Sequence, residues 1–183
     1  MGWCKRTMIE QLKELLEMQR KYDETVMNKY GYVYDDVIAE KNKTSLIVEL
    51  GEMMNEYQSK FKYWRECPHD CREKALEEYV DALHFMLSLF NYYSEKEEFI
   101  IDEEFHNYNN FSEENDELFE CGNLYVVKEI NRLLFFIFYE NSTEWGISYL
   151  FKLGNLLGFK WEEIYNAYKK KNAVNYERLK NGY

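Results

Sequence analysis

The chain has 183 residues, a length that suits one domain with a substantial core, and we expect a single domain over residues 1–183. One proline, eight glycines and an abundance of helix-favouring residues favour an all-α fold over a β-sandwich or barrel. The net charge is −11, and residues 94–120 carry −10 of it, with eleven acidic residues against one lysine. This segment is predicted to be a solvated acidic insert. No nucleic-acid partner is expected, although lysines and arginines elsewhere can bind small anions.

Apolar residues recur at intervals of three and four along most of the chain, which predicts a bundle of about six helices. The first spans residues 7–29 and ends at Gly31. The second begins near Thr44 or Ser45, which are suitable N-caps, and ends before the loop around Pro68. The other helices are predicted at residues 72–93, 123–139, 143–157 and 161–180. No alternating pattern is long enough to require a sheet.

The chain is expected to be a soluble cytoplasmic protein. Its longest uncharged stretch, residues 82–94, contains His, Asn and Ser and falls short of the roughly 20 apolar residues that a membrane span needs. The N-terminus continues directly into a charged amphipathic pattern, which is not typical of a signal peptide. Reduced thiols are therefore expected for its four cysteines, Cys4, Cys67, Cys71 and Cys121.

Two predicted helices carry carboxylates at helical spacing. Glu49 and Glu52 lie on one flank of the second helix, and Glu78 and Asp81 follow 26 positions later (78 minus 52), a separation that lets adjacent antiparallel helices face each other. A single Glu-x-x-Glu motif is usually a solvated face. Asp81, however, interrupts a stretch that is apolar on nearly every side, where an unpaired carboxylate is costly unless it meets a cation. Four carboxylates on rigid helices predict a Mg²⁺ site.

These two motifs resemble the signature of the all-α nucleoside triphosphate pyrophosphatases. Within that superfamily the chain is most similar to the dimeric dUTPases. Four segments carry the resemblance: Glu49-Leu-Gly-Glu-Met-Met-Asn-Glu56, Phe61-Lys-Tyr-Trp64, Glu77-Glu-Tyr-Val-Asp-Ala-Leu-His-Phe85, and Tyr168-Lys-Lys-Lys-Asn-Ala-Val-Asn-Tyr-Glu-Arg178 with Gly182-Tyr183. The resemblance extends from Gln19 to the C-terminus and departs chiefly at residues 94–120.

The resemblance implies a dUTP diphosphatase that hydrolyses dUTP to dUMP and pyrophosphate and also accepts dUDP. It implies two or three Mg²⁺ ions that bridge the carboxylates and the triphosphate. In this arrangement Glu49 would position or deprotonate the attacking water, and Glu52, Glu78 and Asp81 would be metal ligands. The family pairs two such subunits, and the apolar helix at residues 123–139 is a reasonable dimer contact.

Several polar or aromatic residues flank the carboxylates. Gln19 lies in the apolar stripe of the first helix with Asp23 one turn later, where the amide would bind either a uracil edge or the backbone. Lys62 and Trp64 follow the second helix, and the indole would stack on a base or plug the core. His84, one turn after Asp81, is similar to the family's residue near the base and sugar.

The last helix presents a polar face where an ordinary packing helix would be apolar. Lys171, Asn175 and Arg178 lie on this face with Tyr168 and Asn172. A solvated surface is the simpler interpretation. The mixture of cations and amides also suits triphosphate oxygens, two of which Arg can bind at once.

Three other interpretations stay open. The chain could be a related pyrophosphatase that acts on another deoxynucleotide. It could also be a helical protein whose main role is to bind a regulator through its acidic segment. Finally, Cys67, His69 and Cys71 could bind zinc if Cys4 or Cys121 completed a tetrahedral site, although a loop with incidental thiols is the simpler interpretation.

Overall fold

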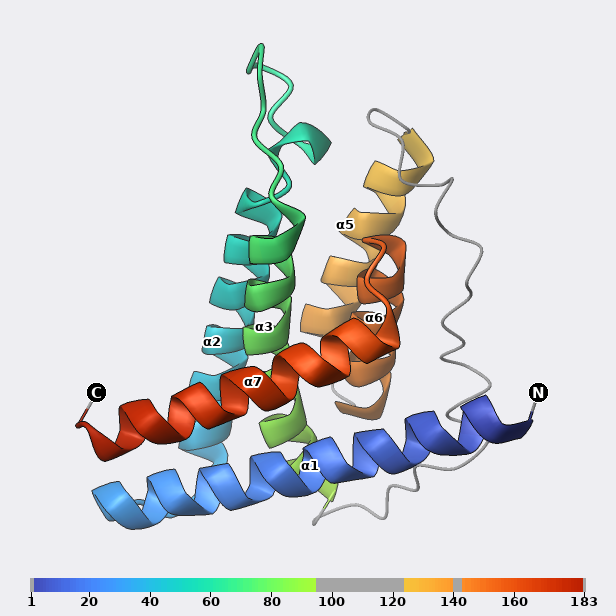
Figure 1. The fold of residues 1–183 in the computed structure, drawn as a ribbon. Helices are drawn as coiled ribbons and strands as arrows, with labels where there is room; N and C mark the ends of the chain where they lie inside the picture. The colour runs from blue at the N-terminus through green and yellow to red at the C-terminus, as the bar shows by residue number, and fades with distance from the viewer. Residues whose placement is uncertain (1, 95–123, 140–142, 183) are drawn as a thin grey trace.

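The computed structural model describes residues 2–94, 124–139 and 143–182, and over these ranges the chain is helical (Figure 1). The expected acidic insert, apart from Ser94, lies outside the described residues. Six α-helices within the described ranges confirm the predicted all-α class. They are α1 (Gly2–Tyr30), α2 (Asp36–Asn55), α3 (Arg72–Ser94), α5 (Leu124–Tyr139), α6 (Thr143–Leu156) and α7 (Trp161–Lys180), with a short 3-10 turn, η1 (Gln58–Lys60), after α2.

The predicted start of the second helix was wrong. Helix α2 begins at Asp36 because the Asp35 side chain accepts a hydrogen bond from the backbone N–H of Ile38 at 2.9 Å, which caps the helix. Thr44 is an interior residue, and its hydroxyl donates to the backbone oxygen of Glu40 at 3.1 Å. The helix is therefore two turns longer at its N-terminus than the sequence pattern indicated.

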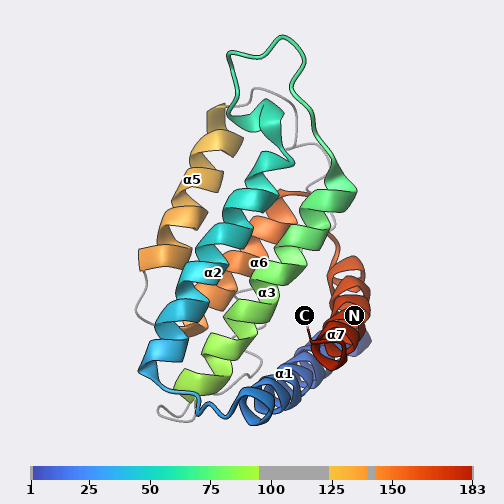
Figure 2. The ribbon, with the colours of Figure 1, turned by 90° about the vertical axis from the view of Figure 1, so that its left-hand side faces the viewer.

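Two helical hairpins and one crossing pair make up the fold. Helices α2 and α3 form one antiparallel hairpin, and α5 packs against α6 beside it. Helices α1 and α7 run side by side across the hairpin of α2 and α3, and Figure 2 shows both nearly end-on beside α3. None of the described helices combines the length and the apolar composition needed to cross a membrane.

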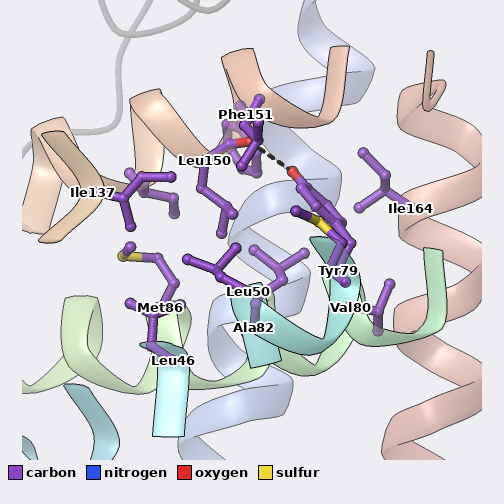
Figure 3. Close-up of a cluster of buried hydrophobic side chains, with 14 of the residues drawn as sticks. Leu46, Leu50, Tyr79, Val80, Ala82, Met86, Ile137, Leu150, Phe151 and Ile164 are labelled. Atoms are coloured by element: carbon purple, nitrogen blue, oxygen red, sulfur yellow. Dashed lines mark hydrogen bonds between the residues drawn. The ribbon is translucent and has the colours of Figure 1, made fainter. Parts of the chain in front are cut away.

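Helix α3 lies at the centre of this arrangement, as its nearly uniform apolar composition predicted. Twelve of its residues are buried, and it contacts α1, α2, α6 and α7. Tyr79 is fully buried and donates its hydroxyl hydrogen to the backbone oxygen of Leu150 at 3.0 Å (Figure 3). Gly154 permits this contact, since a Cβ atom there would lie 2.6 Å from the Tyr79 hydroxyl oxygen.

An ion pair between helix N-termini sets the position of α7. The Arg72 guanidinium donates to both Glu163 carboxylate oxygens, at 3.0 and 2.8 Å, and to the backbone oxygen of Gly158 at 2.7 Å. These hydrogen bonds lower the pKa of Glu163. They hold the start of α7 beside the start of α3, so that the rest of α7 passes over the carboxylates of α3.

Candidate active site

A pocket of about 380 Å³ opens where α1, α2, α3 and α7 meet. Eight of the residues that the sequence singled out line it: Gln19, Asp23, Glu49, Asp81, His84, Lys171, Asn175 and Arg178. They come from four helices and span most of the chain. The fold therefore brings separate sequence motifs to one concave site.

A cluster of carboxylates joins α2 to α3 at this pocket. One oxygen from each of Glu49, Glu52 and Glu78 lies within 4.8 Å of the other two. The three-residue step between Glu49 and Glu52 puts both on the face of α2 that meets α3. An oxygen-only cluster of this kind suits a hard cation such as Mg²⁺ better than zinc.

Asp81 stands next to this cluster and has a cationic partner of its own. Its carboxylate accepts a hydrogen bond from the Lys171 ammonium at 2.5 Å, and its side chain is 18% exposed. Asp81 is thus partly rather than fully buried. Through this pairing, Lys171 of α7 places a positive charge next to the carboxylates.

The electrostatics of the cluster favour a bound cation. Burial, followed by the negative charges of Asp81, Glu52 and Glu78, raises the pKa of Glu49 to about 7. The pKa values of Glu78 and Asp81 are also raised, chiefly by burial, although Lys171 opposes the shift of both. Clustered carboxylates whose pKa values are raised in this way are typical of functional sites.

A hydrogen-bond network surrounds Gln19 at the other end of the pocket. Gln19 is 3% exposed, and its side-chain oxygen accepts from the Tyr168 hydroxyl at 2.7 Å and lies 2.7 Å from Nδ1 of His84. Its amide nitrogen donates to Asp23 at 2.8 Å. Among the described residues, the buried amide therefore bonds to side chains, which disfavours the backbone alternative.

This network defines the state of His84. Since the Gln19 oxygen can only accept, Nδ1 of His84 carries the hydrogen and Nε2 is left with a lone pair. Nε2 is buried, with no hydrogen-bond partner among the described residues. Burial, aided by the charge of Lys171, lowers the pKa of His84 to about 3, so the ring is neutral.

Asn42 and Tyr34 extend the network and were missed in the sequence. Ser88 donates to Asp23 at 2.7 Å, while Asn42 donates to Ser88 at 3.0 Å and to the Tyr34 hydroxyl at 2.6 Å. The sequence carried a signal for Asn42, because it lies seven residues, or two helical turns, before Glu49. That signal depended on recognising Asp35 as the helix cap.

Lys62 and Trp64 are not brought into the pocket. Both lie in the connection that follows α2, where the Lys62 ammonium donates to the Asn55 side chain at 3.2 Å. Trp64 is 63% exposed and packs edge-on against Tyr63 and Phe61. A contact of either residue with a nucleotide base stays a prediction.

The fold and this site together define an all-α enzyme with an acidic cluster and opposing cations in one pocket. The sequence model of the dUTPase family matches residues 11–183, and the chain therefore belongs to the dUTPase family. It is a hydrolase that acts on a phosphoanhydride bond of dUTP. A search of curated proteins found no match to the chain.

Proposed function

We propose that Glu49, Glu52, Glu78 and Asp81 bind two or three Mg²⁺ ions and that dUTP is hydrolysed beside them to dUMP and pyrophosphate. The convergence of three carboxylates from α2 and α3 within 4.8 Å supports this proposal most directly, since one of them, Glu49, lines a pocket that also contains cations. Bound Mg²⁺ would neutralise phosphate charge and lower the pKa of a coordinated water. We expect dUDP to be accepted as well.

Glu49 is the residue best suited to take the proton of the attacking water. A general base works most effectively when its pKa lies near the working pH, and burial among carboxylates raises the pKa of Glu49 to about 7. Glu52 and Glu78 face Glu49 from the same cluster and would hold metal. Asp81 would join them once Lys171 moves from its carboxylate to a phosphate oxygen.

The cationic face of α7 would bind the triphosphate. Lys171, Asn175 and Arg178 all line the pocket, so one ammonium, one amide and one guanidinium share it with Glu49 and Asp81. Arg can bind two phosphate oxygens at once, and each well-placed donor is worth a few kcal/mol if it binds the transition state more tightly than the substrate. The uracil would lie beside Gln19, Asp23 and His84, whose network offers both donors and acceptors.

We also propose that two subunits associate through α5, in the cytoplasm, as in the dimeric dUTPases that the sequence resembles. Leu124, Tyr125 and Phe135 of this helix are 66%, 59% and 53% exposed. Phe136, in contrast, stacks on Tyr149 of α6 with ring centroids 4.9 Å apart. A Phe135→Glu variant should therefore yield monomers in sedimentation, and an unchanged dimer would reject this contact.

The direct test is pyrophosphate release from dUTP, dTTP, dCTP and dATP, with and without Mg²⁺. We expect selective turnover of dUTP that requires Mg²⁺ and is abolished in Asp81→Asn. Glu40→Gln is the matched control, because Glu40 lies on α2 outside the pocket lining and pairs with the neighbouring Lys43 on the surface. Turnover without a divalent ion, or in Asp81→Asn at the wild-type rate, would reject the proposed metal site.

A further inference from the structure

A second group of metal-ligand side chains lies away from the pocket, at the end of the α2–α3 hairpin opposite α1 (Figure 2). It consists of Glu56, His69 and Cys71. One carboxylate oxygen, one imidazole nitrogen and the thiol sulfur lie within 4.8 Å of one another. The group contains three different ligand types, unlike the oxygen-only cluster in the pocket.

Backbone hydrogen bonds fix the relative positions of these three residues. Tyr57 and Asp70 form an antiparallel bridge, and the N–H of Cys71 donates to the backbone oxygen of Glu56 at 2.8 Å. The N–H of Gln58 donates to the backbone oxygen of His69 at 3.2 Å. Glu56 and Cys71 are therefore held opposite each other before any ion binds, with His69 two residues from Cys71.

The Asp70 side chain makes this loop more rigid. Its carboxylate accepts hydrogen bonds from both the backbone N–H and the hydroxyl of Ser59, the former at 2.8 Å. Cys71 also begins the hydrogen-bonding pattern of α3, since its backbone oxygen accepts from the N–H of Ala75 at 3.0 Å. Its thiol lies 3.8 Å from a carboxylate oxygen of Glu73, a weak contact that a metal would replace.

The chemistry of the three ligands selects zinc over magnesium. Zn²⁺ binds thiolate, imidazole and carboxylate at about 2.0 to 2.3 Å, so ligand atoms of a tetrahedral site are roughly 3.5 Å apart. The observed spacing needs only small side-chain movements to reach that value. Mg²⁺ would avoid a thiolate, so the two clusters on this hairpin differ in the ion that they prefer.

We propose that Glu56, His69 and Cys71 bind one Zn²⁺ ion, with water in the fourth position. The ion would join the end of α2 to the start of α3, the two helices that carry the pocket carboxylates. The sequence had suggested Cys67 as a ligand, and the structure puts Glu56 in that place. The proposal does not depend on nucleotide hydrolysis, because its ligands are not part of the pocket lining.

Cobalt substitution of the reduced, metal-stripped, full-length protein tests this site. Co²⁺ bound through a thiolate gives a charge-transfer absorption band, which an oxygen-only site cannot produce. We expect the band in the wild type and its loss in Cys71→Ser. Zinc affinity, measured by competition with a chromogenic chelator, should fall more than about 100-fold in Cys71→Ser, since partners that merely orient metal ligands already contribute about 10- to 100-fold.

Three further variants make the test specific. His69→Ala changes an exposed side chain and should weaken zinc binding while circular dichroism shows an intact helical fold. Cys67→Ser and Glu49→Gln should both retain the cobalt band, because neither residue belongs to the group. A wild type without the band, or a Cys67→Ser variant that loses it, would overturn the proposed ligand set.

Discussion

The two ends of the pocket, around Gln19 and around Glu49, differ in how their buried polar groups are paired. Around Gln19, donors and acceptors from α1, α3 and α7 are paired with one another, and Tyr168, His84 and Asp23 each contact this amide. Around Glu49 the neighbouring groups are other acceptors, and the positive charge comes from Lys171 on α7. At the first end the protein pairs these groups itself, apart from Nε2 of His84, whereas the second end needs a cation from outside.

The pKa values express the same contrast. Burial lowers the pKa of His84 to about 3 and keeps its ring neutral, which suits a site for an uncharged base. Burial and like charges raise the pKa of Glu49 to about 7, which suits a site for metal and phosphate. We therefore expect substitutions at the first end to lower stability as well as uracil binding, and those at the second to lower activity with little loss of stability.

The largest expected effect is the loss of hydrolysis in Glu49→Gln. We expect the kcat/KM for dUTP to fall by more than about 100-fold, because the substitution removes both the proposed base and a metal ligand. The melting temperature of the metal-free protein should stay unchanged or rise, since a repulsive charge is removed. Steady-state kinetics and thermal melts check both parts. A fall in Tm of several degrees would show that Glu49 is a structural residue.

At the other end of the pocket, Gln19→Leu should lower the stability of the fold, unlike Glu49→Gln. It leaves Tyr168 and Asp23 without the buried amide, at a cost of about 1 to 3 kcal/mol. A chain of this size loses about 2 to 4 °C of Tm per kcal/mol. Tyr168→Phe removes a single bond and should cost less. If Gln19→Leu has the same Tm as the wild type, the network does not stabilise the fold.

The smallest expected effect is the pH dependence of the metal-free protein. Because the folded protein raises the pKa of Glu49 to about 7 from 4.5, it binds more protons than the unfolded chain between these values, and stability falls as pH rises through them. Asp23, whose pKa is raised to about 6 from 3.8 mainly by burial, acts in the same direction. His84, whose pKa is lowered to about 3 from 6.5 by burial, opposes both below about pH 6.5 and reduces the net fall. Melts from about pH 5 to 8 should show Tm falling by a few degrees.

Mg²⁺ should weaken the part of this pH dependence that comes from Glu49. Deprotonated carboxylates bind the ion, so the rise in Tm on adding Mg²⁺ should be greater near pH 8 than near pH 5. Glu49→Gln provides the control, because it should flatten the metal-free profile and reduce the Mg²⁺ effect. A metal-free Tm that rises steadily between about pH 5 and 7 would contradict the pKa shifts.

The helices that sequence predicted best were those whose own apolar pattern defined them. Helix α3 was found almost to the residue, since it is buried on nearly all sides, and α7 was found at its observed bounds. The start of α2 was missed because Asp35, its cap, stands apart from the apolar stripe used to place the helix. Asn42 was not predicted as a site residue for the same reason, since it lies in the part of α2 that was missed.

Among the candidate site residues, spacing along a helix was the reliable guide. Glu49 and Glu52, or Glu78 and Asp81, had to share a face because three residues span almost one helical turn. Lys62 and Trp64 lie in a connection without such periodicity, and their positions depend on how the loop packs. The pairing of Lys171 with Asp81 joins residues 90 positions apart, which no local pattern reveals.

The sequence by itself determined the all-α class, most helix bounds and the two carboxylate motifs, because these follow from short-range periodicity and helix geometry. Tertiary structure decided which groups meet across helices: the Gln19 network, the partner of Asp81 and the meeting of Glu56 with His69 and Cys71. These contacts depend on the register between packed helices and on one bridged loop. Register is set by the packing of the whole core, and local sequence does not specify it.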